Sequence, residues 1–275
     1  MATNIAQHVE SSLRPATEPA WRRGFANLLR QENRRWWGTR RGLVQSLIWL
    51  ILVNTVVAFM LWVLPWSERM QGTPMPAKAV VAGVINILGS TLGLFGAMGV
   101  AIIAQSAIVG EKQLGTAAWI LSKPVVRGSM ILSKLVAYTM AIIVTMIMFP
   151  GATAFAQIAF VSGGSLAVAP FLAGVAVLGL HLLFYLCLTL LLGTLVDGRG
   201  PVIAVPLSLL FLQQMIGSIL GPVRLVLPGT LIDLAQMMIL RQPLPATWAV
   251  PVAATAAWSI VCVAVAIWRF GRDEF

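Results

Sequence analysis

Few residues in this sequence are able to do acid, base or nucleophilic chemistry. His8 and His181 are its two histidines, and Cys187 and Cys262 are its two cysteines. Neither pair has metal-ligand spacing, and there is no HExxH or GxSxG motif. The sequence also lacks the GxxxxGK[ST] loop that would hold a nucleotide phosphate. We therefore expect a chain that is not an enzyme and that carries no metal or cofactor of its own.

The composition places most of the chain in a membrane. Hydrophobic residues make up 59% and charged residues only 10%, against about 25% charged residues in soluble domains. A net charge of +10 would suit nucleic acid, but most of the charge lies in the first 41 residues and in loops, not on a folded basic face. We expect an integral membrane protein with no nucleic-acid partner, in which both cysteines are small packing residues.

The apolar runs predict an all-α protein with six transmembrane helices, because about 20 apolar residues cross the hydrocarbon core. The predicted spans are 43–64, 80–108, 130–150, 170–195, 201–220 and 247–268. They form one six-span transmembrane domain, 42–275, after a segment 1–41. Glycine, serine and proline at 162–170 separate the third span from the fourth.

The segment 1–41 combines a polar tail with a basic amphipathic helix. Apolar residues fall at helical spacing on one side and arginines on the other; the apolar set is Trp21, Phe25, Leu28, Leu29 and Trp36. Such a helix either lies in the membrane interface or packs on a partner protein.

The distribution of lysine and arginine predicts the orientation. Of the 19 such residues, only Arg69, Lys78, Arg224 and Arg241 fall on the side opposite the termini. By the positive-inside rule, both termini are cytoplasmic in a multi-pass protein of the cell membrane. Residues 221–246 are too apolar for an ordinary loop, and we expect short helices that either dip into the outer leaflet or lie on its surface.

A polar segment interrupts the apolar runs at 110–124, GEKQLGTAAWILSKP. Thr116 can cap a short helix that Pro124 ends near Ser122, and Trp119 gives that helix an apolar surface. On the cytoplasmic side, this short helix either folds back on the membrane or docks into a groove of a partner.

The residues of this segment resemble a known signature. The order Glu111, Gly115-Thr116, an apolar stretch, Pro124, Arg127 and Lys134 is similar to the cytoplasmic signature of type-2 ABC exporter permeases, and the whole layout resembles that family, in particular its multidrug and copper-enzyme-maturation branch. The resemblance implies a coupling helix that fits a cleft on a separate ATPase subunit. It also implies two ATPase copies that bind ATP and Mg, and a homodimer of permease chains around the path.

By the same resemblance, two sets of residues receive roles. The ATPase-coupling positions are Glu111, Lys112, Gly115, Thr116, Trp119, Pro124 and Arg127. The positions lining the translocation path are Asn86, Gln105, Gln213 and Gln214, although interhelical hydrogen bonds explain these amides equally well.

The second predicted span has further features of interest. Gly89, Gly93, Gly96 and Gly99 lie near one side of it, which favours close helix packing over a role in substrate passage. No charged residue lies deep in any predicted span, so the energy for transport is expected to come from a separate ATPase. The competing interpretation is a membrane scaffold or channel component that transports nothing by itself.

Overall fold

The chain folds as a bundle of long helices. The computed structural model describes residues 24–113, 127–164, 166–216, 219 and 221–272, and among these there is no strand. Five helical runs are long and apolar enough to cross a membrane: Arg40–Met70, Ala77–Gln113, Arg127–Val161, Val168–Leu195 and Ala249–Phe270. These runs make the chain a multi-pass membrane protein and coincide with five of the six predicted spans. The remaining prediction, 201–220, falls on α12 (Arg199–Ile216), which contains Pro206 and is not among the five.

Most of the runs consist of several segments in sequence. The first contains α3 (Arg40–Ala58), the π-helical η2 (Phe59–Val63) and α4 (Leu64–Met70). The second contains α5 (Ala77–Ser90), the π-helical η3 (Thr91–Phe95), α6 (Gly96–Ala104) and α7 (Ser106–Gln113). The third contains α9 (Arg127–Ile142), the π-helical η4 (Ile143–Met148) and α10 (Phe149–Val161).

The remaining helices are single segments. They are α2 (Phe25–Trp37), α11 (Val168–Leu195), the short 3₁₀ helix η5 (Gly221–Val226), α13 (Thr230–Ile239) and α14 (Ala249–Phe270). Helix α10 ends at Val161 and α11 begins at Val168, so the predicted break in the long apolar run is confirmed. The short helices η5 and α13 lie within 221–246, where short helices were expected.

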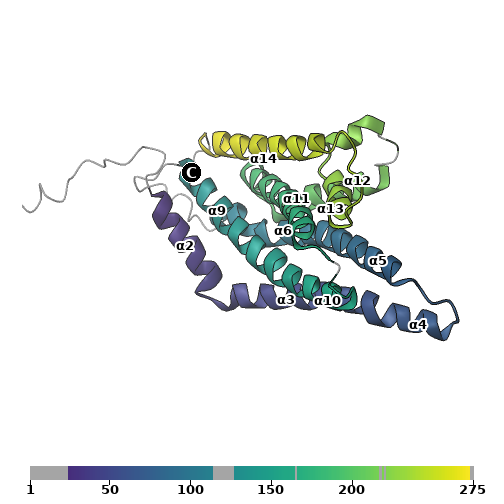
Figure 1. The fold of residues 1–275 in the computed structure, drawn as a ribbon. Coiled ribbons are helices and arrows are strands. Elements are labelled where there is room, and N and C mark those ends of the chain that lie inside the picture. The colour runs from purple at the N-terminus through teal and green to yellow at the C-terminus, as the bar shows by residue number, and fades with distance from the viewer. Residues whose placement is uncertain (1–23, 114–126, 165, 217–218, 220, 273–275) are drawn as a thin grey trace, which may run out of the picture.

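Helix α11 lies at the centre of the bundle. It packs against α14 and α13 on one side and against α6 on another, while α3 and α10 form the opposite layer (Figure 1). The start of α9, helix α2 and the C-terminal end of α14 lie together on the left of that view. We call this the loop end, because it is where residues 114–126 join α7 to α9; the end that carries η5 and α13 is the far end.

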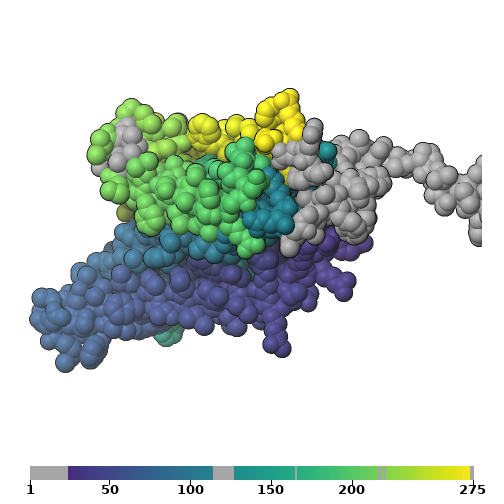
Figure 2. All heavy atoms as spheres, turned by 180° about the vertical axis from the view of Figure 1, so that it is seen from behind, coloured from purple at the N-terminus to yellow at the C-terminus, as the bar shows by residue number. Residues whose placement is uncertain are grey.

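The opposite face shows how α12 completes the bundle. In Figure 2, green α12 lies above the blue and purple first part of the chain, consistent with its packing on α6 and α11. Its apolar side chains Phe211 and Leu212 are exposed, and so are many on the outward side of α3. Exposed apolar side chains on long helices are expected where the surroundings are lipid.

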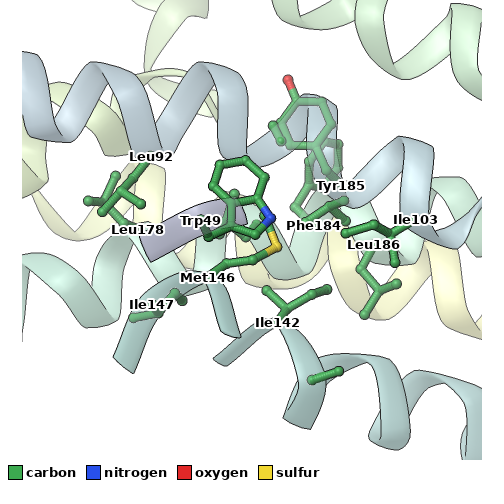
Figure 3. Packing of buried hydrophobic residues seen from close by; sticks show 14 of the residues in the cluster. Trp49, Leu92, Ile103, Ile142, Met146, Ile147, Leu178, Phe184, Tyr185 and Leu186 are labelled. Atoms are coloured by element: carbon green, nitrogen blue, oxygen red, sulfur yellow. The ribbon is translucent and has the colours of Figure 1, made fainter. Parts of the chain in front are cut away.

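A continuous apolar core joins the layers. Trp49 of α3 and Met146 of η4 lie close together in its middle, and Tyr185 of α11 lies nearby (Figure 3). Cys187 and Cys262 are both buried and unbonded to one another, which confirms their prediction as packing residues.

The glycines of the second run allow the close approach predicted for them. A side chain at Gly89 would meet Gln236 of α13 at 2.7 Å, and one at Gly96 would meet Leu182 of α11 at 3.1 Å. Gly93 faces Ile232, and Gly99 faces Trp49. The packing role of these glycines is therefore confirmed.

Candidate functional site

Four charged side chains meet at the loop end and form what we call the charge cluster: Glu32, Arg35, Glu111 and Lys134. The Lys134 ammonium Nζ lies 2.8 Å from Oε1 of Glu32 and 2.7 Å from Oε1 of Glu111. The Arg35 guanidinium Nη1 lies 3.0 Å from each of the same two oxygens. Two cations and two carboxylates thus balance each other across α2, α7 and α9.

Three of the four members of the charge cluster are buried, and Arg35 is half-exposed. The Lys134 side chain is only 2% exposed, and both carboxylates are buried. Burial lowers the pKa of Arg35, but the hydrogen bond that it donates to Glu111 and the charges of both carboxylates raise it more, so its pKa lies above the ordinary value. Because an unpaired buried charge is costly, the four groups hold their three helices in one arrangement.

Aromatic rings surround one side of the charge cluster. Trp36 of α2 and Tyr138 of α9 meet edge to face with ring centroids 5.3 Å apart. The Arg41 guanidinium lies over the Trp36 ring at 4.4 Å and donates to the Ile103 carbonyl at 3.4 Å. Helix α2 therefore packs on the bundle through a mixed apolar and charged surface, not through apolar side chains alone.

The end of α7 is also fastened to the end of α11. Lys112 Nζ donates to the Thr194 carbonyl at 2.9 Å and lies 3.4 Å from Oδ1 of Asp197. Gln113 Nε2 donates to the Asp197 carbonyl at 2.9 Å. These bonds hold the last turn before residue 114 against the centre of the bundle.

The first residue of α9 contacts a different helix. Arg127 Nη1 donates to the Gly271 carbonyl, directly after α14, at 3.0 Å. Of the predicted coupling residues, Glu111, Lys112 and Arg127 therefore lie at the two edges of 114–126 and contact α2, α9, α11 and α14. Gly115, Thr116, Trp119 and Pro124 lie outside the described residues.

Two adjoining cavities lie at the far end. The larger, the wide chamber, has a volume of about 580 Å³ and lies between α5, η5, α13 and the start of α14. Its wall is mostly apolar, with amides and one ion pair interspersed; it includes Asn86, Arg224, Leu225, Asp233, Leu234, Gln236, Met237, Gln242, Trp248 and Pro251. This size falls within the range of about 300–1,000 Å³ typical of small-molecule sites.

The smaller cavity, the narrow chamber, has a volume of about 210 Å³. Its lining is mostly polar and comprises Gln213, Gln214, Arg224, Leu227, Gly229, Thr230 and Asp233. Arg224, Thr230 and Asp233 line both chambers, and the Arg224 guanidinium is paired with the Asp233 carboxylate. The ion pair therefore stands at the boundary between an apolar space and a polar one.

The structure brings three of the four predicted path residues to these chambers. Asn86 lines the wide chamber, and Gln213 and Gln214 line the narrow one. Gln213 also accepts from the Gly229 amide at 2.6 Å and donates to the Tyr185 hydroxyl at 3.2 Å, so it serves the interhelical packing that was left open as an alternative. Gln105 lies between α6 and α7, near the loop end, and does not join them.

His181 of α11 links the second run to the far end. Its ring nitrogens lie 3.0 Å from the Pro228 carbonyl and 3.1 Å from the Gly93 carbonyl. Gly93 belongs to η3, where the wider π turn changes the backbone hydrogen-bond pattern. His181 is completely buried, and the geometry gives it the structural role of fastening η3 to the segment that precedes α13.

Sequence reasoning did not single out two members of the charge cluster. Glu32 is the only acid in the otherwise basic α2, which was the available signal, and Arg35 was interpreted only as part of the basic side of that helix. Lys134 was named in the sequence analysis only as part of the signature of the resembling family, and no ion-pair partner was predicted for it. Among the described residues, no group of three histidine, cysteine or acidic side chains is placed to hold a metal ion.

Comparison of the sequence with protein-family models and with curated proteins found no match. The functional interpretation therefore depends on the arrangement of the residues themselves.

Proposed function

We propose that this chain is the transmembrane permease subunit of an ATP-driven exporter of the ABC type. A separate ATPase subunit would bind the 110–124 segment on the cytoplasmic side, with ATP and Mg held by that partner. Two ATPase copies would act on a homodimer of this chain in the cell membrane. The alternative is a scaffold or channel component without ATP-driven transport.

One observation carries this proposal: the residues at both edges of 114–126 make polar contacts with α2, with the middle of α9, and with the C-terminal ends of α11 and α14. Glu111 contacts Lys134 of α9 and Arg35 of α2. Lys112 contacts the end of α11, and Arg127 the end of α14. A force applied between Gln113 and Arg127 would therefore reach most of the bundle through short polar contacts.

This arrangement suits coupling because packed helices move as rigid elements. If two ATPase subunits close on ATP and push on the segment, α7 and α9 shift with the helices bonded to them, and the bundle changes between two packings. A surface loop without such contacts would absorb the displacement instead. The chain's lack of a phosphate-binding loop makes a separate source of energy necessary for this mechanism.

The proposal includes a particular topology. Helix α12 makes the sixth crossing, so that both termini and the loop end face the cytoplasm. Helix α2 then lies at the inner membrane interface, where its exposed arginines suit the headgroup zone. Helices η5 and α13 lie at the outer leaflet, and the two chambers open there.

The test is to co-express the chain with the product of a neighbouring reading frame that contains a GxxxxGK[ST] motif, purify the complex and measure ATP hydrolysis in lipid nanodiscs. We expect Gly115→Pro to reduce co-purification, because it alters the segment that would dock. We expect Glu111→Gln to retain co-purification but to lower hydrolysis, because residue 111 loses its ion pairs with Lys134 of α9 and Arg35 of α2.

Two exposed cations at the other side of the membrane provide matched controls. Lys78→Gln and Arg69→Gln remove a charge without touching the loop end, so binding and hydrolysis should match those of the native chain. If the ATPase does not bind, or if Glu111→Gln and Gly115→Pro both leave binding and hydrolysis unchanged, the exporter proposal is wrong and the scaffold or channel alternative stands.

A further inference from the structure

The two chambers at the far end have complementary chemistry. The wide chamber offers apolar wall from Leu234, Met237 and Trp248, and the narrow chamber offers amides and backbone. Arg224 and Asp233 stand where the two meet. A molecule that occupies both must have an apolar part and a polar part joined within a short distance.

We propose that the chambers bind a single amphiphile whose head group carries both a phosphate and an ammonium. The apolar chain would lie in the wide chamber and the head in the narrow one. The phosphate would accept hydrogen bonds from the Arg224 guanidinium, which suits phosphate oxygens in pairs. The ammonium would donate to the Asp233 carboxylate.

The charge at the boundary decides between head groups. One arginine and one aspartate sum to zero, so a purely anionic head would gain from Arg224 but would meet the Asp233 carboxylate. An uncharged head would have to separate Arg224 from Asp233 without offering either residue a new charged partner. A head with both charges replaces the Arg224–Asp233 pair by two new pairs, Arg224 with the phosphate and Asp233 with the ammonium. The net charge of this head is zero, like that of the ion pair.

The ion pair is able to open for such a ligand. Its side chains are 47% and 43% exposed, and pairs of that exposure contribute little to stability because water screens them. The side chain of Gln214 is exposed on the narrow chamber's wall, where its amide can bond to the head. Trp248 is 43% exposed at the wide chamber, in keeping with the preference of tryptophan for the membrane interface.

The experiment uses the purified full chain in detergent and native mass spectrometry with four probes at equal concentration. The probes are palmitoyl lysophosphatidylethanolamine, palmitoyl lysophosphatidylglycerol, monopalmitoylglycerol and glycerophosphoethanolamine. We expect the first to bind more tightly than each of the others by about tenfold or more, the value of one charge-assisted hydrogen bond. Weak binding of the last probe shows that the apolar chain is required.

Three variants sharpen the test. Asp233→Asn leaves the boundary positive, so the preference should move from the ethanolamine to the glycerol phospholipid. Arg224→Gln should weaken both phospholipids, and Met237→Trp, which fills the wide chamber, should weaken every probe that has a chain. Arg69→Gln removes an arginine that lines neither chamber and should leave all four affinities unchanged. Melting temperatures close to that of the native chain establish that each variant is folded.

Equal binding of the three chain-bearing probes to the native chain would overturn the proposal. So would an unchanged preference in folded Asp233→Asn. The further claim that the bound amphiphile is the exported molecule rests on the proposed exporter function. Because the binding measurement contains no ATPase, the failure of one proposal is distinguishable from the failure of the other.

Discussion

Replacement of Lys134 by methionine should destabilise the chain strongly, because it leaves two buried carboxylates with only half-exposed Arg35 between them. Lys134 Nζ lies 2.8 and 2.7 Å from the carboxylate oxygens of Glu32 and Glu111. Removal of one partner from a buried ion pair costs about 3–5 kcal/mol. At about 2–4 °C per kcal/mol for chains of 150–250 residues, the melting temperature should fall by about 6–20 °C.

The double variant Lys134→Met, Glu111→Gln provides the sharper measurement. It restores charge balance, since Glu32 and Arg35 remain as a pair at 3.0 Å. Contacting residues in one ionic network show interaction energies of about 0.5–3 kcal/mol. We therefore expect the double variant to be less destabilised than the sum of its two single variants.

The assay is thermal unfolding in detergent, followed by the retained monodisperse fraction in size-exclusion chromatography. Lys78→Met makes the same chemical change at an exposed position and should stay within about 0.5 kcal/mol of the native chain. If Lys134→Met melts within 2 °C (roughly 0.5–1 kcal/mol) of the native chain, or if the two single effects simply add, then the charge cluster does not hold α2, α7 and α9 together.

Three further changes test the packing, each by the same melting assay. Gly174→Val should lower the melting temperature, because the new carbon would lie 2.5 Å from Ile239, whereas Gly83→Val, with no atom within 4 Å, serves as its matched control. His181→Phe should cost about 1–3 kcal/mol, since it removes the ring N–H that donates to one of two buried carbonyls, those of Pro228 and Gly93. Trp49→Ala should cost about 3–5 kcal/mol, because this buried ring fills the middle of the core.

Much of the fold was predictable because long apolar runs leave few alternatives. In lipid, an apolar segment can pair its backbone hydrogen-bonding groups only as a helix, so the length of an apolar run is enough to predict a spanning helix. Five predicted spans coincide with helices. The helices extend further than predicted, as α7 does to Gln113, because polar residues near a membrane surface continue a helix when other helix ends offer them partners. The π-helical segments left no mark in the sequence that hydropathy could detect.

The candidate site was predictable only in part, since pairing depends on tertiary structure. Glu32 and Lys134 are 102 positions apart in sequence, and no periodic pattern in the sequence predicts their contact. The amides that were assigned together to a path divide in the structure, because Gln105 lies near the loop end. The types of residue at the two ends of the bundle were predictable from the sequence. They are cations near Glu111 at the loop end, and apolar and amide residues near Asp233 at the far end.

One helical run connects the loop end to the far end of the bundle. Glu111 of the charge cluster and Asn86 of the wide chamber lie on the same helical run, Ala77–Gln113. Between them lies η3, where the two ring nitrogens of His181 lie 3.1 Å from the Gly93 carbonyl and 3.0 Å from the Pro228 carbonyl; a neutral ring donates to one of the two. Gly229, the next residue, donates to Gln213 in the narrow chamber. π segments are among the places where helices kink, so we expect a tilt of α6 and α7 at the loop end to be taken up at η3. Through His181, that change would reach the turn 227–229 between η5 and α13, whose residues Leu227 and Gly229 line the narrow chamber.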